Sequence, residues 1–431
     1  MKRFIAGFLM LISTLSAVPL RAQTDCAYNQ LSTDNPTSLY YHLWQLTDPA
    51  LPAAPALVDT YFRIGEIMAA ANRYDPAINF LSNGIQLAES TINAQFAAAQ
   101  FSDDESTRRD TYLGILALYT PLSRAYFQRG LANAALGDMD SAIDDFTQSL
   151  NYDPRFADAY HSRGTVQFEH ARPQHAIADL TCAIGLQPDE ALHYQHRGWA
   201  YEQLGNLDQA LADYNQTLLL NPNNTLAYVN RGSIYRQFGD YALATQDYNR
   251  ALALKPNQVA AYNNRGLTWA AQGLYDRALM DYDAALALEP ANAAVLNNRA
   301  WASFKMGATT QAVIDATRAI FAAPDDPAGY RNRAWFYFQS ENYVQALQDY
   351  NTVLNLDPLD AESFNQRGLT HMALDRDAQA VTDFTRAINL DPDFAAAYGN
   401  RARAYLSLGN PALALADSLR WTELLRDDAG S

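Results

Sequence analysis

The stretch NNRGLTWAAQGLYDRALMDYDAALALEP, from Asn263 to Pro290, contains the unit from which most of this chain is built. Arg265 lies beside a glycine, and Asp281 follows sixteen residues later. Apolar residues recur around both at three- and four-residue spacing, which is typical of one face of a helix. A glycine at 273 and the proline at 290 end the two patterns. The stretch therefore predicts two helices joined by a tight turn.

The same pattern recurs every 34 residues, nine times without a gap, from Ser123 to Asp428. A small residue follows the arginine in each unit: Gly130, Gly164, Gly198, Gly232, Gly266, Ala300, Ala334, Gly368 and Ala402. An alanine opens each second helix: Ala142, Ala176, Ala210, Ala244, Ala278, Ala312, Ala346, Ala380 and Ala414. Small residues let two helices approach closely. Because a helix pair cannot bury its apolar face alone, we expect neighbouring pairs to stack.

This pattern resembles the tetratricopeptide repeat. The likeness rests on the small residue, the alanine, a proline that closes eight units, and an aromatic residue near the start of the unit, as in Tyr126, Tyr160, Tyr194, Tyr228 and Tyr262. The resemblance implies an all-α fold, a right-handed superhelical solenoid of helix-turn-helix repeats. It also implies a concave groove formed by the first helices, and a scaffold that binds proteins or peptides.

The residues before the nine repeats extend the array. Residues 58–122 are predicted to hold a divergent repeat, with Gly65 and Ala77 in register, followed by a helical insertion with the polar break SDDEST. Residues 23–57 are rich in proline and turn residues around one helical stretch, and we expect them to cap the array.

The last repeat departs from the pattern where a further repeat would dock. Ser418 replaces the aromatic residue, Trp421 replaces a small residue, and Thr422 replaces a leucine. A terminal repeat needs a face that tolerates water. We therefore interpret this repeat as a C-terminal cap, with the Trp421 ring folded over the last helix pair.

The first 22 residues have the pattern of a secretory signal. Lys2 and Arg3 precede the apolar run FIAGFLMLISTLSAV, and the small residue Ala22 marks a cleavage site. The alternative is an uncleaved anchor. Export to the periplasm or the extracellular space is the prediction. No other apolar run reaches the roughly 20 residues of a membrane-spanning helix.

Composition excludes several classes of function. The formal charge of −16 makes nucleic acid a poor partner, since an acidic chain repels phosphate backbones. No phosphate-cradling glycine motif, nucleophile elbow or paired carboxylates stand outside the repeated charges, so neither an enzyme nor a cofactor is predicted. His161 and His196 lack further ligands at metal-binding spacing, so no metal site is predicted. Cys26 and Cys182 either form a disulfide or remain thiols.

A charge pair recurs in all nine repeats. The arginines are Arg129, Arg163, Arg197, Arg231, Arg265, Arg299, Arg333, Arg367 and Arg401. The aspartates are Asp145, Asp179, Asp213, Asp247, Asp281, Asp315, Asp349, Asp383 and Asp417. The divergent repeat lacks both and has Ile64 and Phe80 instead. Since the charges are present or absent together, we expect them to be contacting partners.

The two charges flank the same helix–helix contact, where a bidentate guanidinium–carboxylate pair fits. Pairing within a repeat competes with pairing of each aspartate to the arginine of the next repeat. Pairing only to the next repeat would leave Arg129 and Asp417 without partners, and both are present, which favours pairing within the repeat. The pair is interpreted as an architectural element that sets register; the functional alternative is an acid–base or anion-binding ladder.

Asparagine precedes the arginine in five repeats, at Asn230, Asn264, Asn298, Asn332 and Asn400. A carboxamide offers a donor and an acceptor together, which matches a peptide backbone. The run resembles the asparagine ladder of the repeat superhelix in O-linked N-acetylglucosamine transferases, which implies a hold on an extended peptide. The alternative is that these amides only cap or solvate helix surfaces.

Tryptophans follow the arginine in three repeats, at Trp199, Trp301 and Trp335. Aromatic side chains on an exposed groove are typical anchors for a partner, whereas at helical spacing they also serve as part of the core. A Trp-rich groove leaves a second hypothesis open, a receptor for a small ligand or a glycan. The identity of a protein partner does not follow from the sequence.

Overall fold

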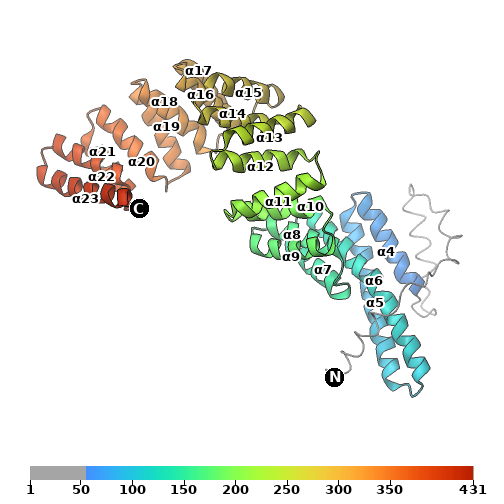
Figure 1. Cartoon of the computed structure of the whole chain (residues 1–431). Helices are drawn as coiled ribbons and strands as arrows, with labels where there is room; N and C mark the ends of the chain where they lie inside the picture. Colours follow the sequence, from blue (N-terminus) through green and yellow to red (C-terminus); the bar gives the residue numbers. More distant parts are fainter. Residues whose placement is uncertain (1–54, 431) are drawn as a thin grey trace. The chain divides into compact units, whose positions relative to one another are not determined.

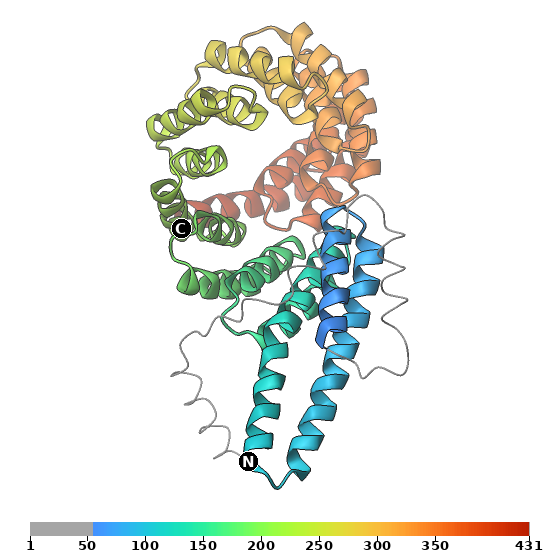
Figure 2. The same cartoon turned by 90° about the vertical axis from the view of Figure 1, so that its right-hand side faces the viewer.

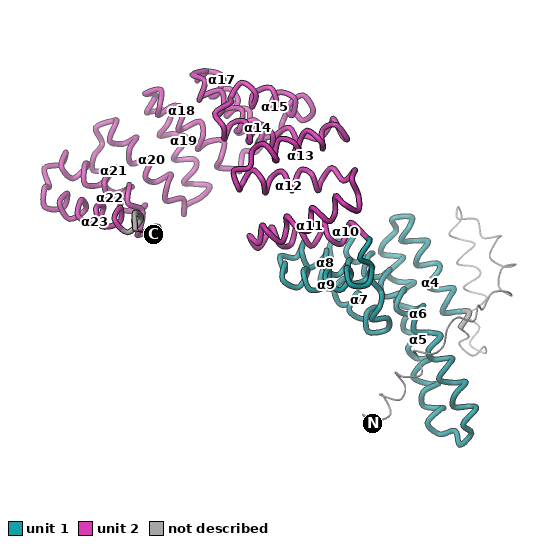
Figure 3. Tube along the Cα trace, in the orientation of Figure 1, with its two compact units in different colours: residues 1–189 teal, residues 190–431 magenta. Residues whose placement is uncertain are grey.

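The computed structural model describes residues 55–430 (Figure 1). These residues form twenty α-helices and no strand, so the predicted all-α fold is confirmed. The chain divides into two compact units, residues 1–189 and residues 190–431 (Figure 3). The predicted signal, Cys26 and nearly all of the predicted N-terminal cap lie outside the described residues.

The described part of the first unit contains six helices: α4 (Pro55–Ala70), α5 (Tyr74–Phe101), α6 (Glu105–Ala135), α7 (Met139–Tyr152), α8 (Ala157–Glu169) and α9 (Pro173–Leu186). The expected insertion is not a separate element, because it lengthens α5 and α6 to 28 and 31 residues. The two long helices run side by side and extend past the N-terminal end of α4 (Figure 2). The polar break supplies the turn, in which Asp104 accepts hydrogen bonds from the backbone N–H groups of Ser106 and Thr107 and so caps α6.

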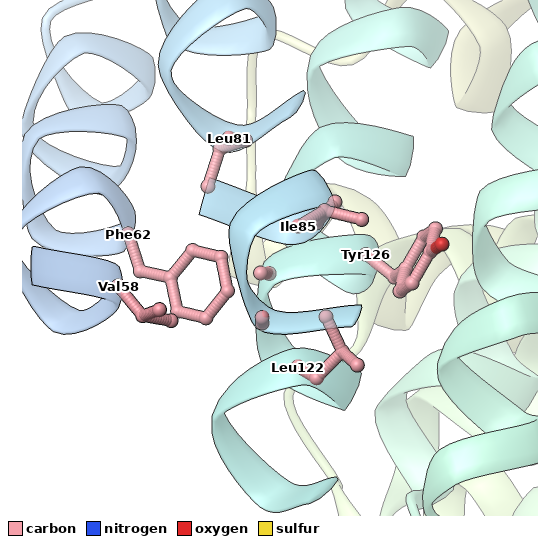
Figure 4. Packing of buried hydrophobic residues seen from close by; sticks show 8 residues of the cluster. Val58, Phe62, Leu81, Ile85, Leu122 and Tyr126 are labelled. Carbon is pink, nitrogen blue, oxygen red and sulfur yellow. The ribbon is translucent and has the colours of Figure 1, made fainter. Parts of the chain in front are cut away.

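Apolar side chains from three helices fill the core of the divergent repeat (Figure 4). The labelled residues are Val58 and Phe62 from α4, Leu81 and Ile85 from α5, and Leu122 and Tyr126 from α6. All are less than one tenth exposed. The divergent repeat is thus joined to the first regular repeat by a continuous apolar core.

The second unit contains fourteen helices. They are α10 (Ala191–Gln203), α11 (Leu207–Leu220), α12 (Thr225–Gln237), α13 (Tyr241–Leu254), α14 (Val259–Ala271), α15 (Tyr275–Leu288), α16 (Ala293–Lys305), α17 (Thr309–Ala322), α18 (Pro327–Gln339), α19 (Tyr343–Leu356), α20 (Ala361–Ala373), α21 (Asp377–Leu390), α22 (Ala395–Ser407) and α23 (Pro411–Gly430). Each helix packs on the next, and each first helix from α12 to α20 also contacts the first helix of the following repeat. The first helices therefore form a continuous row, here called the first-helix face.

Small residues allow the two helices of a repeat to pack closely. A Cβ atom on Gly266 would lie 2.6 Å from Cε1 of Tyr282, whose ring is buried. Gly273, at the turn between α14 and α15, has a φ of +74°, which favours glycine. Glycine thus meets a packing requirement at one position and a backbone requirement at the other.

The last helix pair, α22 and α23, carries the substitutions that the sequence analysis assigned to a C-terminal cap. The Trp421 ring packs on α22, with ring atoms 3.2 Å from where a Cβ atom of Gly399 would lie. The same helix nevertheless exposes Leu415 and Leu419, at 62% and 60%. The last helix therefore combines a packed tryptophan ring with apolar side chains at the surface.

Candidate functional site

The recurring arginine and aspartate meet across the contact between the two helices of each repeat. In the α14–α15 repeat, Arg265 Nη2 donates to Asp281 Oδ1 at 2.6 Å and Nε donates to Oδ2 at 2.8 Å. The Asp281 carboxylate is buried, and the Arg265 side chain is 21% exposed. The hydrogen bond to Asp281 raises the pKa of Arg265, against the opposing effect of burial. This is the bidentate geometry expected for the contact between the two helices of a repeat, here called the seam.

All nine repeats have this pair within the repeat. The N–O distances are 2.6–2.8 Å in Arg129–Asp145, Arg163–Asp179, Arg197–Asp213, Arg231–Asp247, Arg265–Asp281, Arg299–Asp315, Arg333–Asp349, Arg367–Asp383 and Arg401–Asp417. In the divergent repeat, Ile64 and Phe80 belong to one buried apolar cluster instead.

The third guanidinium nitrogen reaches back to the preceding repeat, a contact that the sequence analysis missed. Arg163 Nη1 donates to Thr147 Oγ1 at 2.9 Å, and Arg129 Nη1 donates to Ser82 Oγ of the divergent repeat at 3.0 Å. Within the second unit the acceptors are Asn215, Asn249, Asp283, Thr317, Asn351 and Thr385. The last repeat has Leu419 at this position. Within each unit, these arginines therefore link one helix pair to the pair before it.

Aromatic rings complete the arginine environment. The guanidinium carbon of Arg265 lies 5.7 Å from the ring centroid of Tyr262, one turn earlier on α14. Equivalent contacts involve Tyr126, Tyr160, Tyr194, Tyr228, Tyr330, Phe364 and Tyr398. The cation–π contact adds to the ion pair. A carboxylate, a polar side chain of the preceding repeat and an aromatic ring thus surround the Arg265 guanidinium.

The asparagines of the first-helix face are half-buried, and several bond to neighbouring first helices. Asn298 Nδ2 donates to Asn263 Oδ1 at 2.8 Å, and Asn400 Nδ2 makes the same bond to Asn365. The Asn230 side chain lies beside the Tyr214 hydroxyl. These amides are therefore not simply solvated, and part of their hydrogen-bonding capacity joins neighbouring repeats.

Two of the tryptophans form a cluster with this amide row. Trp301 and Trp335 have ring centroids 4.6 Å apart, and Trp301 Nε1 donates to Asn332 Oδ1 at 2.8 Å. Both rings are half-buried against a cluster that includes Phe336. The structure thus brings Trp301, Trp335 and Asn332 together, with each ring serving partly as core.

Trp199 lies apart from that cluster, on α10. Its ring stacks on His196 with a centroid distance of 4.8 Å, and both side chains are half-buried. Burial, with His193 nearby, lowers the pKa of His196 to about 4. His196 is therefore neutral at neutral pH.

Models of the tetratricopeptide repeat match residues 123–156, 196–259, 229–293, 263–327, 361–394 and 384–416. Together these matches cover just over half of the chain. The protein belongs to the tetratricopeptide repeat family. Members of this family are typically non-catalytic scaffolds that mediate protein interactions. No curated protein matches the sequence.

Solved tetratricopeptide repeat structures share the fold. A tetratricopeptide repeat protein from Parabacteroides merdae is 21% identical, with a TM-score of 0.50 over 57% of this chain and 98% of its own. Yeast Tom70 is 15% identical, with a TM-score of 0.45 over 85% of this chain and 92% of its own. YrrB, described as having an unusual peptide-binding site, is 20% identical, with a TM-score of 0.36 over 43% of this chain and 95% of its own. The likeness to the Parabacteroides protein concerns the fold alone.

Within residues 55–430, no three His, Cys, Asp or Glu side chains gather as metal ligands would. None of the helices in this range is long and apolar enough to cross a bilayer. Cys182 is exposed and has no disulfide partner in this part of the chain.

Proposed function

We propose that this tetratricopeptide repeat protein is an exported scaffold that binds an extended segment of a partner protein along its first-helix face. The observation that carries the proposal is the row of amides on α14, α16 and α18 beside the Trp301–Trp335 pair. These first helices pack on one another in order. A peptide backbone needs donors and acceptors along such a row, with aromatic surfaces to anchor its side chains.

The row keeps free capacity on both sides of the hydrogen bond. Asn264 makes no side-chain hydrogen bond to any described residue, so its donor and acceptor are both available. The described residues also leave Asn298 Oδ1 and Asn332 Nδ2 unpaired, because each amide uses only its other atom. Three consecutive repeats thus offer at least one unpaired amide atom each, and the acidic charge of the chain favours neutral or basic segments.

A second candidate is a receptor for a small ligand or a glycan. The observation that favours it is the Trp301–Trp335 pair, in which two half-exposed indole rings lie 4.6 Å apart. A flat sugar or an aromatic ligand stacks on such rings. The peptide remains the main proposal, because the amide row extends beyond the tryptophans.

The test uses a partner captured from the native envelope fraction, reduced to a fragment whose affinity can be measured. The double substitution Asn264→Ala with Asn298→Ala should weaken binding about tenfold or more, because each lost peptide hydrogen bond contributes roughly 0.5–1.5 kcal/mol. The melting temperature should change little.

A matched control is Asn365→Ala, which breaks the equivalent amide bond to Asn400 outside the proposed row. It should have a similar effect on stability and leave the affinity unchanged. Intact binding in the double variant, or a loss of binding that the control reproduces, would count against the amide row. Retained peptide binding with lost glycan binding in Trp301→Ala would favour the second candidate.

Export is part of the proposal and rests on the N-terminal pattern alone. We expect the mature chain to begin at Gln23 and to occur in the periplasmic or extracellular fraction. Mass spectrometry of the protein from its producing cell measures the N-terminus directly. A chain that retains Met1 in the cytosolic fraction would overturn the export proposal and leave the binding proposal standing.

A further inference from the structure

Amide side chains bond across neighbouring first helices in two contacts of the second unit. Asn298 Nδ2 donates to Asn263 Oδ1 at 2.8 Å, between α16 and α14. Asn400 Nδ2 donates to Asn365 Oδ1 at 2.8 Å, between α22 and α20. In both pairs the donor lies 35 residues after the acceptor, one repeat and one residue further along the chain. The repeat therefore has one place for a donor amide and one for an acceptor amide.

Asn332 and Asn297 occupy the same two places in the contact between α18 and α16, yet this bond is absent. The helices α14, α16 and α18 each have 13 residues, begin 34 residues apart and pack on one another in order. Asn297 is 8% exposed, and its Oδ1 atom is enclosed without a hydrogen-bond partner among the described residues. Such an oxygen has lost its bonds to water and gained none, which is destabilising.

The Trp301 indole explains the missing bond. Asn332 Oδ1 accepts from Trp301 Nε1 at 2.8 Å, and the described residues leave Asn332 Nδ2 unpaired. In the two contacts that have the amide bond, the residues at the place of Trp301 are Leu267 and Leu369, which carry no donor. The amide thus bonds to its neighbouring amide where a leucine stands, and to the indole where a tryptophan stands.

The Asn332 side chain therefore has two alternative partners. If it turns from Trp301 to Asn297, one hydrogen bond replaces another, and the pair becomes the same as in the other two contacts. The turn satisfies the enclosed Asn297 oxygen and leaves the indole N–H without an acceptor. Because an indole N–H can only donate, the group that replaces Asn332 there must offer an acceptor atom.

We propose that Asn332 is a two-position amide, which turns from Trp301 to Asn297 when a backbone carbonyl oxygen of the bound peptide accepts from Trp301 Nε1. This step rests on the proposed function. Asn332 and Trp301 are both half-buried, so the place that the amide oxygen leaves is reached from the first-helix face. The acidic net charge of the chain disfavours an anionic acceptor and leaves the neutral carbonyl. Asn297 is then a positioning residue, since it acts through Asn332.

The first experiment needs no partner and therefore separates the two-position amide from the proposed function. The full chain is labelled with ¹⁵N-tryptophan, and the Trp301 indole signal is identified by its loss in Trp301→Phe. Exchange of this N–H with solvent requires Asn332 to leave it. Asn297→Leu removes the alternative acceptor, so the exchange should slow by about threefold or more. A substitution that merely loosened the fold would speed the exchange instead.

The matched control is Asn365→Leu, the same substitution at the equivalent place of α20, which should leave the Trp301 exchange rate unchanged. Asn297→Ala gives a second reading, because it removes the acceptor and needs no room for a larger side chain. Slower exchange in either Asn297 variant supports the two-position amide. An unchanged or faster rate in both variants would overturn it.

The second experiment measures affinity with the captured partner fragment. Trp301→Phe and Asn297→Leu should each weaken binding by about two- to tenfold, since each removes one hydrogen bond of the bound state. In the Trp301→Phe background, Asn297→Leu should cause no further loss. There Asn332 bonds to Asn297 with and without the peptide, so the bond no longer favours the bound state.

Two results would overturn the role in binding: full affinity in Asn297→Leu, or the same loss from this substitution in both backgrounds. Failure of the proposed function has a different sign, which is full affinity in the Asn264→Ala with Asn298→Ala variant. The exchange rate of the Trp301 indole is measured without the fragment and is unaffected by that outcome.

Discussion

Two repeats of this chain seal the same helix–helix contact in different ways. In the α14–α15 repeat, Arg265 and Asp281 form a bidentate ion pair across it. In the α4–α5 repeat, Ile64 and Phe80 occupy those two positions and are buried in an apolar cluster with Met68. An ionic seam and an apolar seam therefore support the same helix pair.

The two repeats share a glycine directly after this first-helix position: Gly65 follows Ile64, and Gly266 follows Arg265. A Cβ atom would lie 2.5 Å from Leu81 Cγ at Gly65, and 2.6 Å from Tyr282 Cε1 at Gly266. Close approach of the helices is thus common to both repeats, whereas the charge pair is not. The arginine adds a directed hydrogen bond to the preceding repeat, which an aliphatic side chain cannot make. The comparison indicates that small residues set the packing and that the charges set the register between repeats.

The largest effect is expected from breaking the ion pair on one side. Asp281→Ala leaves Arg265 half-buried beside an empty site, and it should destabilise the repeat by about 3 kcal/mol. Hydrogen–deuterium exchange of α14 and α15 measures the loss locally. Asp276→Ala, which removes an exposed carboxylate of α15, is the control and should leave exchange unchanged. Equal protection in both variants would show that the pair does not hold the seam.

A somewhat smaller effect should be common to both repeats. Gly65→Ala and Gly266→Ala each force a methyl group against a buried side chain, which should cost about 1–3 kcal/mol. Urea denaturation followed by local exchange compares the two. Gly185→Ala serves as a control, since a Cβ atom there has nothing within 4 Å. A strong loss in one repeat with no change in the other would contradict the shared packing requirement.

The smallest effect concerns the link between repeats. Asn249→Ala removes the acceptor of Arg265 Nη1 and leaves the bond to Asp281 in place. Because the contact is exposed, the loss should be about 1 kcal/mol or less. It should appear as lower cooperativity between the α12–α13 and α14–α15 repeats in urea, with Asn223→Ala as an exposed loop control. A change confined to the α14–α15 repeat would argue against a link between neighbours.

The helix pairs and the pairing within each repeat follow from the sequence. Each repeat carries the same spacing of arginine, small residue and aspartate, and the presence of Arg129 and Asp417 favours pairing within the repeat. The link to the preceding repeat also had a signal, because its polar acceptor precedes the arginine by 16 residues, as Asn249 precedes Arg265 and Asp283 precedes Arg299. The sequence does not single it out, because Thr, Asn and Asp vary at this position and resemble an ordinary solvated surface.

Features that occur once could not be predicted in this way. Arg236 looks like an ordinary surface substitution until the fold places it beside the Tyr248 hydroxyl. The lengths of α5 and α6 could not be predicted from the repeat, because the insertion has no repeated counterpart. In addition, α6 continues through Pro121, a residue that often ends or kinks a helix. The sequence pattern indicates asparagines that hold a peptide or solvate helix surfaces, whereas bonds such as Asn298 to Asn263 depend on how neighbouring first helices stack.

The most direct test transfers the apolar seam into a regular repeat. The double variant Arg265→Ile with Asp281→Phe gives the α14–α15 repeat the pair found at Ile64 and Phe80. Urea denaturation of the wild type, both single variants and the double variant gives a double-mutant cycle. The free energy of unfolding of the double variant should exceed the value expected from adding the two single losses by at least about 1.5 kcal/mol. The double variant should recover much of the stability that either single change removes. Losses that simply add would contradict the account, because the two seams would then not be alternative solutions to the same packing.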